Sequence, residues 1–104
     1  MAWVYLFAAG ILETLWAVAM KASNGFTLLT PSVITALAMI GSVALLALSM
    51  KTLPLGTAYV VWTGIGAVGA FAAGVIFFGE SLSLVRVIAA GFILIGLILM
   101  KASA

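Results

Sequence analysis

The chain has little charge and lacks several chemically reactive residue types. Its 104 residues include no cysteine and no histidine, and only 6% of them are charged. The absence of cysteine excludes disulfides and thiol chemistry. With only two carboxylates and no histidine, one chain cannot build a common zinc site, so we expect no metal, no other cofactor and no enzymatic centre. Four scattered basic residues are also not the footprint of a nucleic-acid-binding protein.

Apolar residues make up most of what is present. They account for 67% of the chain, and the mean hydropathy is +1.48. A soluble domain carries about 25% charged residues, so the composition predicts an integral membrane protein. A helix needs about 20 residues to cross the hydrocarbon core. We therefore expect an all-α membrane protein, a single domain over residues 1–104, with four transmembrane helices at about Trp3–Met20, Pro31–Met50, Thr57–Phe78 and Leu84–Met100.

Turn and cap residues set the expected limits of these helices. Thr30 is the expected hydroxyl N-cap of the second helix, with Pro31 at the first helical position. A tight turn is expected at 53–56, and Gly79 begins the break before the fourth helix. The first apolar segment is interpreted as a membrane helix, because no basic region and no small-residue cleavage site mark it as a signal peptide.

Glu13 is the only acidic residue inside an apolar segment. A charged side chain at the centre of a membrane helix costs about 2.5–3.5 kcal/mol on insertion scales. Such residues usually face a bundle interior or a water-filled cavity and bind ions or protons. Glu13 is therefore the primary candidate for a binding site.

The charge distribution gives no preferred orientation in the membrane. Four helices place both termini on one side, together with Lys51 and Lys101, whereas Lys21 and Arg86 lie on the other. Because each side has two basic residues, the positive-inside rule predicts no preferred orientation. Transporters often build a central site between two inverted repeats, and this chain is too short to contain two. We therefore expect an antiparallel homodimer of dual topology, with one Glu13 from each copy near the centre; insertion fixed by another factor remains the alternative.

Aromatic and hydroxyl side chains are expected to surround Glu13. Gly10 and Trp16 share its helical face, Tyr59 and Trp62 share a face of the third helix, and Ser42 is a hydroxyl in mid-span. A carboxylate with indole and phenol rings suits a cation, through charge and cation–π attraction. Packing is the alternative role for each aromatic residue, and Ser42 could instead bond to its own helix. The fourth helix, with its small residues Gly91 and Gly96, is assigned to contact with the second copy, or otherwise to lipid.

The third helix also contains a glycine run that matches a nucleotide-binding pattern. Gly64, Gly66 and Gly69 fit G-x-G-x-x-G, but that pattern binds dinucleotides only between a strand and a helix. Inside an apolar span, these glycines favour close helix packing and a weak point at which the helix bends. Gly64 and Gly66 are the candidate bend residues.

These residues resemble a known family over essentially the whole chain: the small multidrug resistance transporters, and within them the guanidinium exporter subtype. The resemblance is carried by Glu13-x-x-Trp16-Ala17, by Lys21–Thr27 with Pro31-Ser32, by Lys51–Tyr59, by Trp62–Ala67 and by Met100-Lys101. Trp16, Met39 and Ser42 are more similar to the guanidinium subtype than to the quaternary-ammonium subtype. One departure is Leu28, where the family pattern leads us to expect a basic residue.

The resemblance implies a secondary active transporter in the bacterial inner membrane, a multi-pass protein that exports guanidinium or substituted guanidinium ions against protons. It implies that Glu13 binds proton and substrate in turn, that Trp16, Ser42, Tyr59 and Trp62 orient Glu13 through hydrogen bonds, and that the bend at Gly64–Gly66 differs between the two copies. The expected partners are the cation, protons, the lipid bilayer and a second copy of the chain.

Three other functions are compatible with a membrane glutamate. The nearest is export of quaternary ammonium or other hydrophobic cations, which have no N–H to donate and depend on ring faces. A proton-carrying rotor subunit also uses one carboxylate, but it is typically a two-helix hairpin. A non-catalytic membrane adaptor would not need the buried carboxylate.

Overall fold

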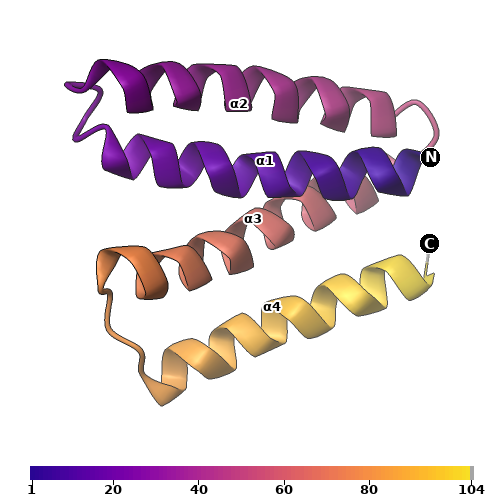
Figure 1. Cartoon of the computed structure of the whole chain (residues 1–104). Helices are drawn as coiled ribbons and strands as arrows, with labels where there is room; N and C mark the ends of the chain where they lie inside the picture. Colours follow the sequence, from indigo (N-terminus) through magenta and orange to yellow (C-terminus); the bar gives the residue numbers. More distant parts are fainter. Residues whose placement is uncertain (104) are drawn as a thin grey trace.

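The computed structural model describes residues 1–103, which form four long helices joined by short turns. The helices are α1 (Ala2–Ala22), α2 (Leu29–Ser49), α3 (Leu55–Phe78) and α4 (Leu84–Ser103). Each is long and apolar enough to cross a membrane. Figure 1 shows successive helices running in opposite directions across the picture, so that both termini lie at one end of the bundle, at the right. The all-α, four-helix expectation is therefore confirmed.

The helix limits differ from the expected ones by at most three residues, and the expected N-cap of α2 is wrong. Thr30 is not its N-cap: the helix begins at Leu29, after Leu28 with extended backbone angles and no side-chain cap. Pro31 is thus the third helical residue, where its missing N–H is still one of the unpaired donors of the first turn. At the next turn, Leu55 and Gly56 already belong to α3, so the non-helical turn ends at Pro54.

Helix ends beyond the apolar segments are set by backbone hydrogen bonds rather than by hydropathy. α1 continues past Lys21 to Ala22, and α4 continues past Lys101 to Ser103. The break after α3 lies where expected. Gly79 ends that helix with φ 65°, a left-handed conformation that glycine adopts without steric cost.

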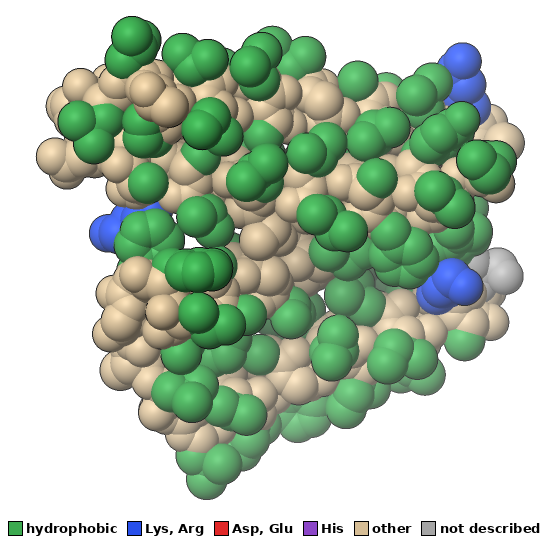
Figure 2. Space-filling view, in the orientation of Figure 1, with side chains coloured by type: hydrophobic (Ala, Val, Ile, Leu, Met, Phe, Trp, Pro, Cys, Tyr) green, Lys and Arg blue, Asp and Glu red, His purple; other side chains and the backbone are tan. Residues whose placement is uncertain are grey.

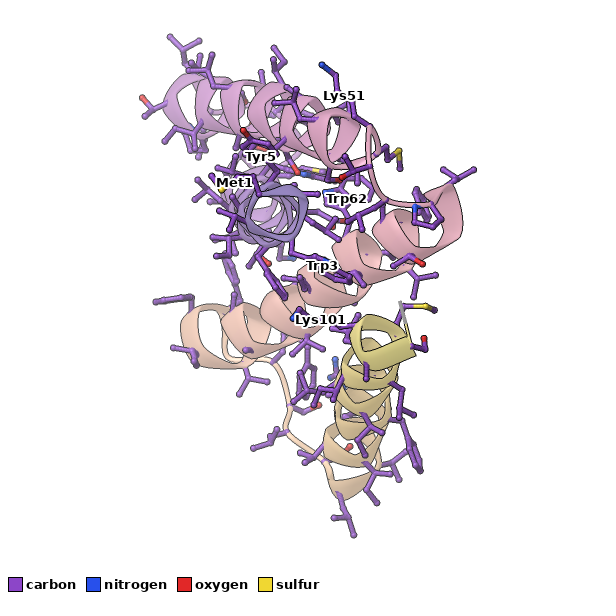
Figure 3. All side chains as sticks on the ribbon, turned by 90° about the vertical axis from the view of Figure 1, so that its right-hand side faces the viewer. Met1, Trp3, Tyr5, Lys51, Trp62 and Lys101 are labelled. Carbon is purple, nitrogen blue, oxygen red and sulfur yellow. The ribbon has the colours of Figure 1, made fainter. Side chains whose placement is uncertain are left out.

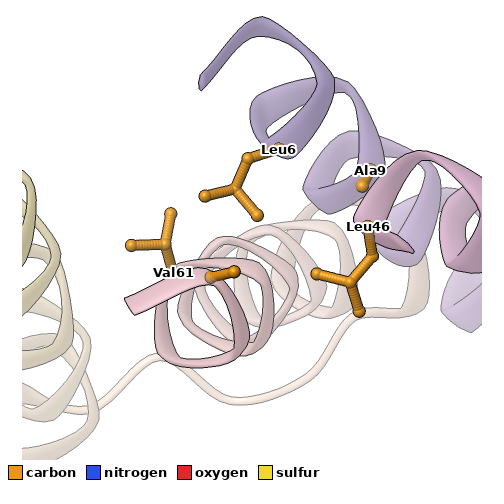
Figure 4. Close-up of a cluster of buried hydrophobic side chains, with 5 residues drawn as sticks. Leu6, Ala9, Leu46 and Val61 are labelled. Atoms are coloured by element: carbon orange, nitrogen blue, oxygen red, sulfur yellow. The ribbon is translucent and has the colours of Figure 1, made fainter. Parts of the chain in front are cut away.

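The core lies where α1, α2 and α3 meet. Leu6, Ala9, Leu46, Ala58 and Val61 are its buried members, and Figure 4 shows side chains from the three helices pointing toward one another. α4 packs beside α3 and has no buried residue. On the face drawn in Figure 2, apolar side chains spread over all four helices, and basic side chains lie toward the two ends. An apolar surface between charged ends is what a lipid environment requires.

Candidate functional site

The carboxylate of Glu13 lies near the middle of α1, against α3. It lies directly against Gly66 of α3, and we call the glycine that such a carboxylate contacts its seat. A methyl group at Gly66 would overlap Oε2 and Cδ of Glu13 and would lie 3.0 Å from its Cγ. Thr14, the residue after Glu13, lies in the same way against Gly69, which is one turn from Gly66 on α3. The glycines of α3 therefore let α1 bring polar side chains directly onto the α3 backbone, which confirms the expected close packing.

Two polar atoms of this site have no partner within the described chain. Oε2 of Glu13 and Nε1 of Trp16 are both buried, and neither forms a hydrogen bond with any residue in the range 1–103. Buried polar atoms in proteins are almost always paired, because an unpaired one keeps the full desolvation penalty. The two residues lie on neighbouring turns of one face of α1. An acceptor and a donor are thus left available for a ligand or a second chain.

Ser42 and Trp62 form a hydrogen-bonded chain across three helices. The indole Nε1–H of Trp62 donates to Ser42 Oγ at 2.9 Å, and Ser42 Oγ donates to the carbonyl of Ala9 at 2.6 Å. Figure 3 shows Trp62 among α1, α2 and α3. Ser42 therefore does not bond to its own helix; it fixes the Trp62 ring and ties α2 to α1.

Tyr59 lies beside Trp62 but faces outward. The two ring centroids are 5.6 Å apart. Tyr59 is 51% exposed and borders an open groove of about 290 Å³, which is otherwise lined by Val60, Thr63, Gly64, Ala67 and Ile93. In a single chain, no hydrogen bond among residues 1–103 joins Glu13 to Trp16, Ser42, Tyr59 or Trp62. Their role in orienting Glu13 remains a prediction.

Gly10 and Gly64 are contact points rather than ligands. A methyl group at Gly10 would lie 2.6 Å from Cγ2 of Ile65, and one at Gly64 would lie 3.0 Å from Cγ of Leu97 on α4. α3 is a continuous helix through Gly64 and Gly66, and the bend remains a prediction. Our sequence reasoning missed Thr14, although its position next to Glu13 and its mid-span hydroxyl were available signals.

Removing the hydroxyl of Ser42 is expected to destabilise the bundle. In Ser42→Ala, the half-buried Trp62 N–H loses its acceptor, and we expect the free energy of unfolding to fall by about 1 kcal/mol. Ser49→Ala is the matched control, because Ser49 is equally buried but bonds only to Leu46 of its own helix. That change should be nearly neutral. Thermal unfolding in detergent compares the two, and equal losses would contradict a special role for Ser42.

Comparison with known proteins gives a consistent result over the whole chain. The family model for Small Multidrug Resistance protein matches residues 1–101. A guanidinium exporter of Yersinia pseudotuberculosis is 56% identical over 101 residues, which cover 97% of both chains. Guanidinium exporters of Citrobacter freundii (53% over 103 residues, 99% of this chain and 98% of the relative) and Salmonella typhimurium strain LT2 (54% over 104 residues, 100% and 99%) are similar to the same extent.

Proposed function

The chain belongs to the small multidrug resistance family, a multi-pass protein of the bacterial inner membrane, and on that premise we propose that it exports guanidinium ions in exchange for protons. The observation that carries this proposal is the buried Oε2 of Glu13, which has no hydrogen-bond partner within residues 1–103. The names of the similar proteins supply the substrate class.

The chemistry of guanidinium fits a free carboxylate. The ion is planar and can donate two parallel N–H bonds to one carboxylate, and such charge-assisted bonds are about twice as strong as neutral ones. A proton binds to the same oxygens, so substrate and proton exclude each other. If the protein reorients only when Glu13 is loaded with one or the other, an inward proton gradient drives the cation outward.

Glycine at position 66 supports this use of Glu13. It lets the carboxylate lie directly against the α3 backbone. Trp62, held by Ser42, places a ring face in the same bundle, and ring faces attract cations. A reorientation that moves α3 relative to α1 would change the surroundings of Glu13 directly. The Gly64–Gly66 segment is the part of α3 where such a movement is proposed to bend the helix.

A second, antiparallel copy of the chain would complete the site. α4 exposes large apolar residues along its length and buries none in the described chain. The four basic residues are divided equally between the two ends, and Figure 3 shows Lys51 and Lys101 at the end that also carries Met1. In an antiparallel pair the carboxylates approach from opposite directions, and the unpaired Trp16 N–H gains an acceptor on the other copy.

Cysteine labelling tests the antiparallel arrangement, because the chain has no cysteine of its own. A single Thr52→Cys in the α2–α3 turn should react with a membrane-impermeant reagent from both sides of the membrane, in similar amounts. Ser83→Cys, in the α3–α4 turn at the other end of the bundle, should give the same result. Dual topology would be contradicted if Thr52→Cys reacted from one side of the membrane only and Ser83→Cys reacted only from the other side. That result would show a single orientation.

Transport by proteoliposomes that contain only this chain tests the function. A pH gradient should drive uptake of radiolabelled guanidinium. Tetramethylammonium, which has the same charge but no N–H, should be transported far less. Preference for tetramethylammonium would favour the sister activity, export of hydrophobic or quaternary cations. Transport of neither ion would contradict a self-sufficient exchanger.

A further inference from the structure

The α3–α4 corner holds a second carboxylate in a defined position. After Gly79 ends α3, the chain folds back, and the backbone N–H of Glu80 donates to the carbonyl of Gly74 at 3.1 Å. The carboxylate of Glu80 then lies over Gly74: a methyl group there would be 2.6 Å from Oε1 and 2.8 Å from Oε2. Glycine at position 74 therefore provides the seat for Glu80, just as Gly66 does for Glu13.

This carboxylate already binds a guanidinium group, which belongs to Arg86. Nη2 of Arg86 lies 3.7 Å from Oε1 of Glu80, and its Nη1 donates to the carbonyl of Ser81 at 3.1 Å. Its central carbon lies 5.4 Å from the centroid of the Phe71 ring. A carboxylate, a carbonyl and a ring face thus surround one guanidinium, and these are the groups that recognise this ion in general.

A pocket extends from this corner toward the contact between Glu13 and Gly66, without including either residue in its lining. It has a volume of about 150 Å³ between α1 and α3, and it is lined by Ala17, Val18, Lys21, Ala70, Gly74, Phe78 and Glu80. Ala17 lies one turn from Glu13 on α1, and Ala70 lies one turn from Gly66 on α3. The outer end of the pocket is therefore formed by Glu80, and its inner end approaches the contact between Glu13 and Gly66.

We propose that Glu80, Ser81 and Phe71 form an outer guanidinium-binding site at the α3–α4 corner, in which the Arg86 side chain is a tethered occupant that free guanidinium displaces. Glu80 joins this site to the outer end of the α1–α3 pocket, whereas Phe71 and Arg86 line the neighbouring groove between α3 and α4. The proposal rests on the proposed function, because it takes the same substrate class. In an antiparallel homodimer, one such site would lie on each side of the membrane.

The exposure of the ion pair suits a site of rapid exchange. Both side chains are almost half exposed, at 44% for Arg86 and 43% for Glu80. Exposed ion pairs contribute little stability, so Arg86 can leave Glu80 at small cost. Lys21 lines the same pocket and repels a second cation, which keeps the occupancy of the site low. The site holds guanidinium at the membrane end without competing with Glu13.

Binding measurements in a Glu13→Gln background isolate the outer site. Equilibrium dialysis of the purified protein with radiolabelled guanidinium, at low ionic strength, measures the guanidinium binding that remains when the Glu13 carboxylate is removed. We expect residual weak binding that is lost in Glu13→Gln/Glu80→Gln. In Glu13→Gln/Arg86→Gln we expect binding to tighten by about two- to sixfold, the gain from removing a competitor that forms an exposed ion pair.

Lys101→Gln is the matched control for Arg86→Gln. It removes the same charge at the opposite end of the bundle, where Lys101 lies over the ring of Trp3. Equal binding by Glu13→Gln/Arg86→Gln and Glu13→Gln/Lys101→Gln would overturn the proposal, as would residual binding that does not depend on Glu80. The comparison of the wild-type protein with Glu13→Gln tests the central site separately. A failure of the central site and a failure of the outer site would therefore appear in different measurements.

Discussion

Replacement of Glu13 with glutamine is expected to abolish proton-driven guanidinium transport and to leave the four-helix fold intact. Glutamine has nearly the same shape, so its contact with Gly66 is retained. It carries no charge and cannot exchange a proton. The loss of a charge-assisted hydrogen bond of about 1.5–3 kcal/mol should weaken guanidinium binding about 10- to 100-fold, and coupling to protons should disappear altogether. Uptake into proteoliposomes under a pH gradient measures both effects.

Glu80→Gln is the matched control for this experiment, because it removes the only other acidic side chain of the sequence. Glu80 lies at the membrane end, and its ion pair with Arg86 is exposed. Coupling of transport to protons should therefore be retained in Glu80→Gln, whereas loss of the outer site should raise the guanidinium concentration needed for half-maximal transport. A Glu13→Gln protein that still accumulated guanidinium against its gradient would contradict the mechanism.

A methyl group at Gly66 is expected to impair the site almost as strongly. In Gly66→Ala, the new methyl group would occupy the position of the Glu13 carboxylate, and the carboxylate or the whole of α1 must move. Overpacking of this kind typically costs about 1–3 kcal/mol. Because the displaced group is the ligand itself, we expect guanidinium binding to weaken by about tenfold or more. Binding isotherms and transport rates of the purified variant measure this effect.

Two other glycines of α3 separate this effect from a general effect of helix packing. In Gly64→Ala, the new methyl group meets only the end of the Leu97 side chain, which can rotate away. This variant should lose some stability and retain guanidinium affinity. In Gly56→Ala, nothing lies within 4 Å of the new methyl group, and no effect is expected. Equal affinities for Gly66→Ala and Gly64→Ala would contradict a specific role of Gly66 as the seat of Glu13.

The sequence was sufficient to predict the elements of the fold, because hydropathy and span length act locally. The helix count, the break at Gly79 and the basic residues at the helix ends all follow from short segments. Thr30 was wrongly expected to cap α2, because backbone geometry at Leu28 starts the helix without a side-chain cap. A hydroxyl before a proline is only a preference, which the preceding turn can override.

Contacts between helices could be predicted only in part. The spacing of Glu13 and Trp16 placed them on one face, and the glycine run predicted close approach of another helix. The particular pairings depend on the rotation and height of each helix relative to its neighbours, which no local pattern specifies. Ser42 thus bonds to Ala9 of α1, and Glu80 folds back over Gly74. Neither contact is visible in the sequence.

Proton release on guanidinium binding tests the central claim most directly. The purified wild-type protein, in weakly buffered detergent solution, is titrated with guanidinium at several pH values while the released protons are counted. Competition for Glu13 predicts proton release that saturates together with guanidinium binding and is absent in Glu13→Gln. Saturable guanidinium binding by the wild-type protein without any proton release would contradict the account, because proton and cation would then occupy different groups.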